Sequence, residues 1–128
     1  MNKILLIGCG HMGNALLDAW ILKTNYSFIV IDPLKFSIIN KKFKNRVKAY
    51  KNLTEVKNIH FINIVMIAVK PQITEDAIKD LSKYFLSNKI IYVSIVAGKK
   101  INFFKKHLPP KNQFIRVMPN MPAMISQG

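Results

Sequence analysis

A glycine-rich turn near the start of the chain has the spacing of a phosphate-binding loop. Residues 8–13 read Gly-Cys-Gly-His-Met-Gly, the pattern G-x-G-x-x-G, between an apolar run and a helical pattern. In such a turn Gly8 permits the tight change of direction, Gly10 lets the backbone approach a diphosphate, and Gly13 lets the helix pack closely. The N–H groups at the helix N-terminus then face the phosphates. The sequence predicts a dinucleotide site, and the alternative is a glycine turn without a ligand.

Asp32 stands where a dinucleotide site of this kind has an acid. It lies 24 residues after Gly8, at the end of a second apolar run. A carboxylate there accepts hydrogen bonds from the ribose hydroxyls and repels a 2′-phosphate, which favours NAD over NADP. Lys35 is near enough in sequence to offset that repulsion. The alternative is that Asp32 caps the next helix ahead of Pro33, so the choice between NAD and NADP stays open.

Three further segments place a lysine or small and polar residues directly after apolar runs. In an open parallel sheet, ligands lie outside the carboxyl ends of the strands, so all three segments should line one edge. They are residues 68–72, with Lys70-Pro71 after the run 62–69, residues 93–98, with Ala97-Gly98 after the run 90–96, and residues 116–123, with Pro119-Asn120 after the run 114–117.

Apolar runs alternate with helical patterns along the chain, which predicts a parallel sheet covered by helices on both faces. We therefore expect an α/β fold, a Rossmann-type doubly wound parallel sheet, with residues 1–128 as a single domain. Thr74 is expected to cap a helix whose buried face holds Ala77, Ile78, Leu81, Tyr84 and Phe85. The expected strands are residues 4–7, 28–31, 47–50, 62–69, 90–96 and 114–117, and the other expected helices are residues 11–23 and 99–107.

The other reactive side chains form no catalytic or metal-binding set. His11, His60 and His107 lack the spacing to Cys or carboxylates that is typical of a metal site, so no metal is predicted. No Ser-His-Asp arrangement can be assembled, and no catalytic residue is assigned. Cys9 is interpreted as a small side chain that fits its turn, and Trp20 as a core residue.

The positive charge of the chain raises the question of a nucleic-acid partner. Twenty Lys and Arg against six Asp and Glu give a formal net charge of +14. Only Arg46 and Arg116 can form the planar fork that reads phosphates and guanine edges, whereas the other 18 are Lys. Because Lys is accompanied by 19 Ile and 12 Asn, the composition is typical of an AT-rich coding sequence. Nucleic-acid binding is the less favoured interpretation.

Length and hydrophobicity favour a soluble, cytoplasmic domain. A chain of 128 residues, half of them hydrophobic, can bury a core without disulfides or metals, and a single Cys fits a reducing compartment. The longest uncharged run, residues 4–17, contains three glycines and is too short to span a bilayer. We therefore expect no association with a membrane.

Together with the glycine loop, the strand-end segments resemble pyrroline-5-carboxylate reductases, the family that makes proline. That family carries a GxGxMG-type loop, an AVKP strand end, an S-I-x-AG strand end and an R-x-MPN-x-P loop, in this order. The ordered set carries the resemblance, which covers essentially the whole chain. Here the four motifs read GCGHMG at residues 8–13, AVKP at 68–71, SIVAG at 94–98 and RVMPNMP at 116–122.

The resemblance implies a nicotinamide dinucleotide, NADP or NAD, as coenzyme. It also implies contacts to each part of this coenzyme. At the diphosphate these are Ile7, Gly8, Cys9, Gly10, His11, Met12 and Gly13, and at the adenosine ribose or its phosphate Asp32, with a further contact from Asn52 before the fourth strand. At the ribose and nicotinamide they are Val69, Lys70, Pro71, Ala97 and Gly98, and beside the nicotinamide Pro119 and Asn120, with Met118. For Lys70 the alternative is an exposed lysine at a strand end.

The family transfers a hydride from the reduced nicotinamide to the C5 imine of 1-pyrroline-5-carboxylate, while the protein orients the reactants. It also has a second, helical domain that builds the dimer and holds the substrate, and this chain has about half the family's length. We expect this chain alone to supply the coenzyme-binding half, with little or no turnover and no homo-oligomer. The alternatives are an inactive or truncated reductase, an enzyme completed by a separately encoded domain, a stand-alone dinucleotide-binding module, and a basic nucleic-acid-binding protein.

Overall fold

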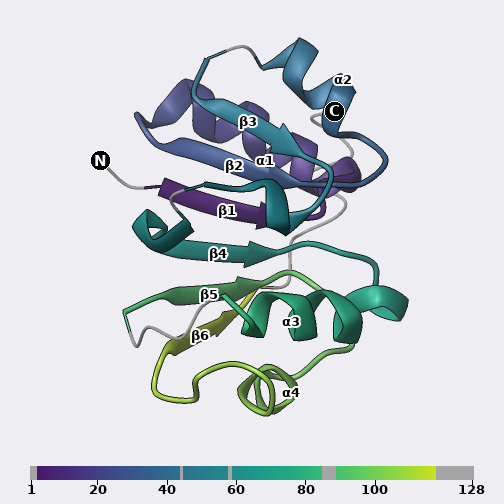
Figure 1. The fold of residues 1–128 in the computed structure, drawn as a ribbon, viewed down its shortest axis with the longest axis vertical. Helices are drawn as coiled ribbons and strands as arrows, with labels where there is room; N and C mark the ends of the chain where they lie inside the picture. Colours follow the sequence, from purple (N-terminus) through teal and green to yellow (C-terminus); the bar gives the residue numbers. More distant parts are fainter. Residues whose placement is uncertain (1–2, 44, 58, 85–88, 118–128) are drawn as a thin grey trace.

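The computed structural model describes residues 3–43, 45–57, 59–84 and 89–117. Six parallel strands form one sheet in the order β3-β2-β1-β4-β5-β6 (Figure 1). The strands are β1 (Lys3–Ile7), β2 (Ser27–Ile31), β3 (Val47–Tyr50), β4 (Ile64–Ile67), β5 (Ile91–Ser94) and β6 (Gln113–Arg116), and the α-helices are α1 (Gly10–Lys23), α2 (Phe36–Lys42), α3 (Thr74–Ser82) and α4 (Ile101–Lys105).

The strand order reverses direction once, between β1 and β4. The chain builds outward from β1 to β3, returns to the other side of β1, and builds outward again from β4 to β6. In doubly wound sheets, ligands bind outside the carboxyl ends of the strands at this point of reversal. The predicted Rossmann-type fold class is confirmed.

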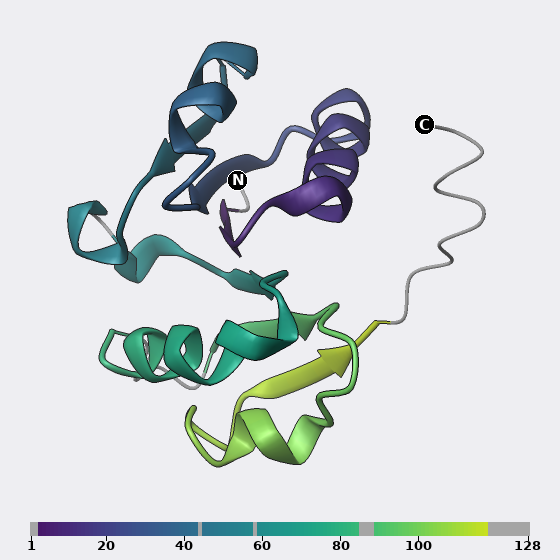
Figure 2. The same cartoon turned by 90° about the vertical axis from the view of Figure 1, so that its right-hand side faces the viewer.

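Side chains of successive strand residues pack into two separate cores, one on each face of the sheet. Leu5 belongs to the core that Ile78 of α3 and Phe104 of α4 complete, whereas Leu6 belongs to the core that Leu17 of α1 completes. Figure 2 accordingly shows α1 and α3 on opposite sides of the sheet. Because both faces are covered, the central strands read as unbroken apolar runs instead of alternating patterns.

Several elements are shorter than their apolar patterns predict. β4 covers only Ile64–Ile67 of the expected residues 62–69, and α4 covers Ile101–Lys105 of the expected 99–107. Ile62 is buried although it precedes the strand. Apolar character follows burial, which extends past the ends of the hydrogen-bonded ladder, so the pattern overestimates the length of the element.

The prediction that Thr74 caps α3 is wrong. A short 3-10 helix, η3 (Pro71–Ile73), precedes α3, and Ile73 occupies the N-cap position. Thr74 is the first residue of the helix, fully buried, and its hydroxyl donates a hydrogen bond to the Lys70 carbonyl at 3.0 Å. The threonine therefore fixes the turn after β4 instead of satisfying the first N–H groups of the helix.

The buried face of α3 is confirmed in its first two turns only. Ile78 and Leu81 are fully buried, and Ala77 packs against the same core. Tyr84 lies beyond the end of the helix and is 38% exposed, and Phe85 lies outside the described residues. Helical spacing predicted a longer apolar stripe than the nine-residue helix carries.

Within the described part of the chain, no helix is both long and apolar enough to cross a membrane.

Tyr92 on β5 provides a test of core packing. Its side chain is 1% exposed and stacks on Phe114 with ring centroids 5.2 Å apart, and its hydroxyl has no hydrogen-bond partner among the residues that the structure describes. Burial also raises the pKa of Tyr92 to about 12. Since a buried hydroxyl without a partner costs about 1–3 kcal/mol, we expect Tyr92→Phe to keep or raise the free energy of unfolding, by up to about 1 kcal/mol. Urea unfolding measures it, and a loss beyond about 1 kcal/mol would contradict the packing described here.

Candidate functional site

The loops that follow the central strands β1 and β4 begin side by side at the carboxyl edge of the sheet. The Gly8 N–H donates to the Ile31 carbonyl at 2.8 Å, and the Ala68 N–H donates to the Ile7 carbonyl at 2.8 Å. The ladder therefore continues one residue past each strand before the chain turns away. The glycine loop, residues 8–13, and two of the predicted segments, residues 68–72 and 93–98, lie where the chain leaves the carboxyl edge of the sheet. Pro119 and Asn120 of the third segment lie outside the described residues.

Both the backbone conformation and the neighbouring atoms require a glycine at position 8. Its φ is +81°, in the left-handed region that favours glycine. A Cβ built at this position would lie 2.9 Å from Val69 Cγ1 and 3.0 Å from the Ala68 carbonyl oxygen. The turn after β1 therefore presses directly on the end of β4, at the point where the strand order reverses.

Gly10 opens α1 and faces free space. Its φ is +36°, and a Cβ built on it would have no atom of the described residues within 4 Å beyond its chain neighbours and its own helix backbone. Cys9 at the N-cap makes no side-chain hydrogen bond to the first turn, which carries no acidic residue. The first N–H groups of this 14-residue helix thus lack the side-chain acceptor that usually satisfies them. The geometry fits a negatively charged group approaching the backbone.

Gly13 is less constrained than the glycine pattern predicts. A Cβ there would lie 3.5 Å from the Gly8 carbonyl oxygen and 3.6 Å from Cys9 Sγ, which is ordinary van der Waals contact. Its position in α1 is helical, so an alanine would fit. Gly13 was predicted to let the helix pack closely, and the contacts are close, but an added methyl group would meet its neighbours only at ordinary distances.

Asp32 fixes the turn ahead of α2 and makes a contact that the sequence did not reveal. The N-cap of α2 is Lys35, so the alternative that Asp32 caps this helix is wrong. Asp32 Oδ1 accepts hydrogen bonds from the Leu34 and Lys35 N–H groups at 3.0 Å each, which stabilises the turn into α2. Its Oδ2 accepts a hydrogen bond from the Cys9 N–H at 3.1 Å. The side chain is buried, and it ties the glycine loop to the β2–α2 turn.

Asn52 follows β3 and caps a 3-10 helix, η1 (Leu53–Glu55). The Asn52 N–H donates to Glu55 Oε1 at 3.0 Å, and the Glu55 N–H donates to the Asn52 carbonyl at 3.2 Å. The spacing N-x-x-E is a capping signal that could have been read from the sequence. The implied coenzyme contact of Asn52 stays a prediction.

The Lys-Pro turn after β4 and the small residues after β5 both leave exposed groups at the edge. Lys70 is exposed, and its carbonyl accepts from the Ile73 N–H at 3.1 Å, so this backbone hydrogen bond shapes the turn. Ala97 and Gly98 are exposed as well, and Gly98 has a φ of +77° with open space around it. Their implied coenzyme contacts stay predictions.

Of the remaining implied contacts, Ile7 is buried at the end of β1, His11 lies in the first turn of α1, Met12 is half-buried in the same turn, and Pro71 opens η3.

Cys9 is a packing residue. Its side chain is 2% exposed and belongs to the core beneath α1. Burial, with a smaller contribution from the negative charge of Asp32, raises the pKa of the Cys9 thiol to about 11. The thiol is therefore protonated near neutral pH and inaccessible, which fits the interpretation of a small side chain in a tight turn.

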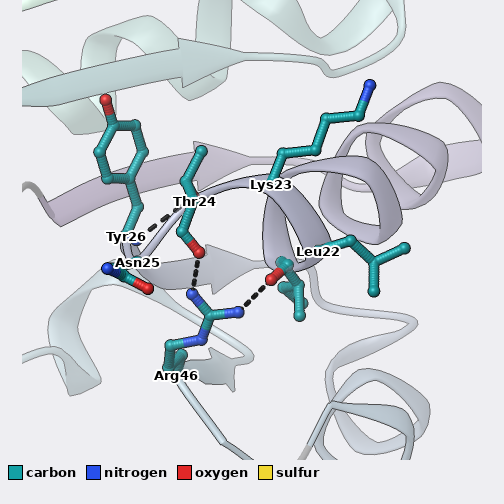
Figure 3. Close-up of a pocket in the computed structure, with 7 residues that line it drawn as sticks. Leu22, Lys23, Thr24, Asn25, Tyr26 and Arg46 are labelled. Atoms are coloured by element: carbon teal, nitrogen blue, oxygen red, sulfur yellow. Dashed lines mark hydrogen bonds between the residues drawn. The ribbon is translucent and has the colours of Figure 1, made fainter.

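A hollow at the opposite edge of the sheet does not compete with this site. It measures about 490 Å³ and lies where α1 ends and β2 begins (Figure 3). The Arg46 guanidinium spans it and donates hydrogen bonds to the carbonyls of Ile21 and Thr24. The arginine fork therefore satisfies the carboxyl end of α1 and is not free to read phosphates there. The hollow is lined by Ile21, Leu22, Lys23, Thr24, Asn25, Tyr26 and Arg46.

Among the residues that the structure describes, no three His, Cys, Asp or Glu side chains are grouped to hold a metal ion.

The comparisons with known proteins agree with this geometry. The family model described as NADP oxidoreductase coenzyme F420-dependent matches residues 3–98. The chain belongs to this family. The predicted nicotinamide dinucleotide coenzyme, NADP or NAD, is in line with the family's description.

Among relatives, the pyrroline-5-carboxylate reductase of Pasteurella multocida (strain Pm70) is 32% identical over 132 residues, which cover 99% of this chain and 47% of that protein. The predicted resemblance to pyrroline-5-carboxylate reductases is therefore confirmed. This chain spans about half the length of the curated relatives that it matches.

Solved structures of that name share the fold. Pyrroline-5-carboxylate reductase from Coxiella burnetii has a TM-score of 0.79 at 22% identity, covering 97% of this chain and 46% of that one. Plasmodium falciparum pyrroline carboxylate reductase with NADP bound has a TM-score of 0.73 at 24% identity, covering 97% of this chain and 44% of that one.

Two glycine substitutions should separate the constraints on the loop. Gly8→Ala brings a Cβ to 2.9 Å from Val69 at a φ of +81°, so we expect a loss of about 1–3 kcal/mol in the free energy of unfolding. Gly13→Ala is the matched control, because the same methyl group enters an ordinary contact within a helix, where alanine is favoured by up to about 1 kcal/mol. Thermal and urea unfolding of both variants measure the two changes in the free energy of unfolding. Equal losses in the two variants would contradict the difference in geometry between the two positions.

The Cys9 thiol should make stability depend on pH in the alkaline range. Its folded-state pKa of about 11 lies above the ordinary value of 9.0, so its contribution is complete below pH 9 and is lost as the pH rises to 11. We expect the unfolding free energy of the wild type to fall relative to Cys9→Ala across this window, by at most about 1.4 kcal/mol per pH unit. Urea titrations at pH 8 to 11 measure the difference, and parallel curves would show that the thiol is not buried as described.

Proposed function

We propose that this chain provides the coenzyme-binding part of a pyrroline-5-carboxylate reductase and binds NADH or NADPH at the carboxyl edge of its sheet. Membership of the NADP oxidoreductase family and the resemblance to pyrroline-5-carboxylate reductases support the proposal. The observation that carries it is the geometry of the glycine loop. Gly10 leaves open space in front of an uncapped helix N-terminus, next to the reversal of strand order.

The backbone of the glycine loop is suited to hold the diphosphate of the coenzyme. The N–H groups of the first turn of α1 and the partial positive charge of its N-terminus stabilise negative oxygens. Gly8 keeps the loop tight against β4, and Gly10 presents no side chain that would hold a ligand away from the backbone. Backbone donors of this kind need no reorganisation when the ligand arrives.

The segments after β4 and β5 are suited to place the rest of the coenzyme. Lys70 is exposed at the same edge, and Ala97 and Gly98 are exposed residues with small or no side chains. We propose that Val69, Lys70 and Ala97 line the ribose and nicotinamide, and that Pro119 and Asn120 lie beside the nicotinamide. The bound coenzyme supplies the hydride for the C5 imine of 1-pyrroline-5-carboxylate, and these residues bind and orient it.

We propose that the groups that hold the substrate belong to the other half of such an enzyme. The curated relatives are about twice as long as the part matched here. A coenzyme site without groups that hold the substrate carboxylate would bind NADH or NADPH and turn over slowly or not at all. Binding and turnover are therefore separate measurements for this chain.

Titration of the purified chain with NADH and NADPH tests the proposal. We expect the nicotinamide fluorescence to change on saturable binding of at least one of them. Gly10→Val should weaken that binding by about tenfold or more, equal to 1.4 kcal/mol, because its side chain fills the space in front of the first turn. Thr54→Val, at an exposed position of η1, is a control that should bind as the wild type does. Absence of saturable binding by the wild type, or undiminished binding by Gly10→Val, would refute the proposed site.

A further inference from the structure

The carboxylate of Asp32 is held almost entirely by backbone N–H groups. The Cys9 N–H lies 3.1 Å from Oδ2, and the N–H groups of Leu34 and Lys35 lie 3.0 Å from Oδ1. Only 8% of the residue is exposed. The three donors come from two loops that are far apart in sequence, so the side chain joins these loops.

This arrangement limits what Asp32 can do for a ribose. An ionised carboxylate has about four acceptor positions, and three of them are used here. Accepting both hydroxyls of an adenosine ribose needs two positions, so one of the backbone hydrogen bonds would have to break. A buried N–H that loses its acceptor is costly, which opposes such an exchange.

The same hydrogen bonds place the glycine loop. The Cys9 N–H belongs to the N-cap residue of α1, one position before Gly10. Because Oδ2 holds this N–H while the Gly8 N–H is held by the Ile31 carbonyl, both backbone donors ahead of Gly10 point into the protein. The following N–H groups of the first turn are then the ones that remain for a ligand.

We propose that Asp32 is a positioning residue that clamps the glycine loop to the turn at residues 33–35 and so sets the loop for a diphosphate, instead of selecting between NAD and NADP at the ribose. The inference rests on the proposed function, because it assigns a role within that coenzyme site. The two phosphates are common to both coenzymes. A clamp on the diphosphate loop therefore acts equally on NADH and NADPH, whereas a ribose contact acts differently on each.

Asp32→Asn tests this role because it keeps the shape of the side chain. The amide has one oxygen and one NH₂ group, so at least one of the three N–H donors loses its acceptor. We expect the affinities for NADH and NADPH to fall by the same factor, about tenfold, with their ratio unchanged within about twofold. Asp18→Asn is the matched control, since it removes the same charge from an exposed ion pair with Lys42 on α1 and α2. The control should bind both coenzymes as the wild type does.

Hydrogen exchange of individual amides distinguishes a local loss of these hydrogen bonds from a general destabilisation of the fold. In ligand-free Asp32→Asn, the amides of Cys9, Leu34 and Lys35 should exchange faster, while amides of β6 and α4 exchange at the wild-type rate. In the wild type, the Cys9 amide should stay protected when NADH binds. This measurement needs no variant, so it decides the matter even where Asp32→Asn fails to fold.

The outcomes separate the inference from the proposed function. If the wild type binds neither coenzyme, both are overturned. If it binds, and Asp32→Asn loses NADH affinity while keeping or gaining NADPH affinity, the proposed function stands and Asp32 is a ribose selector. Loss of protection at the Cys9 amide in the wild-type NADH complex would also overturn the clamp, because the carboxylate would then have exchanged partners.

Discussion

The close approach of Gly8 to the end of β4 is the constraint on which the candidate site depends. β1 is paired with β2 on one side and β4 on the other, so the turn that leaves it has no free side in the plane of the sheet. A residue with a Cβ would collide with Val69, and the positive φ excludes most other residues as well. The chain can leave β1 only by turning tightly over the sheet edge, and this turn delivers the N-terminus of α1 to the reversal point.

The fold and the existence of the edge site could be predicted from the sequence because they depend on patterns that local physics produces. Strands buried on both faces give unbroken apolar runs, and the glycine spacing marks a strand-to-helix turn. The limits of the elements could not be read in the same way. Ile62 is apolar because it is buried, not because it belongs to β4, and Thr74 is buried at the start of α3 for its bond to the Lys70 carbonyl.

The partners of individual polar groups were also beyond the sequence, because they depend on contacts between distant segments. The bond from the Cys9 N–H to Asp32 joins residues 23 apart, and the Arg46 guanidinium satisfies carbonyls at the end of α1 more than 20 positions earlier. The sequence indicates Asp32 as an acid and Arg46 as a fork-shaped cation. Their types were informative, but what each one binds is decided by the packing of the loops around it.

A site made mainly of backbone donors explains how the fold can persist while the side chains change. At 22% identity the structure from Coxiella burnetii has a TM-score of 0.79 with this chain. N–H groups at a helix N-terminus are present whatever side chains the helix carries, so selection at such a site acts on the path of the chain. The strongest demands then fall on residues that fix the path, a glycine where a Cβ would collide and a buried carboxylate that ties two loops. Cys9 lies inside the candidate site and yet contributes a thiol that is buried in the core, with a pKa raised to about 11. Position in the motif alone is therefore not a sign of chemical function, and the partners that each group has in the fold decide it.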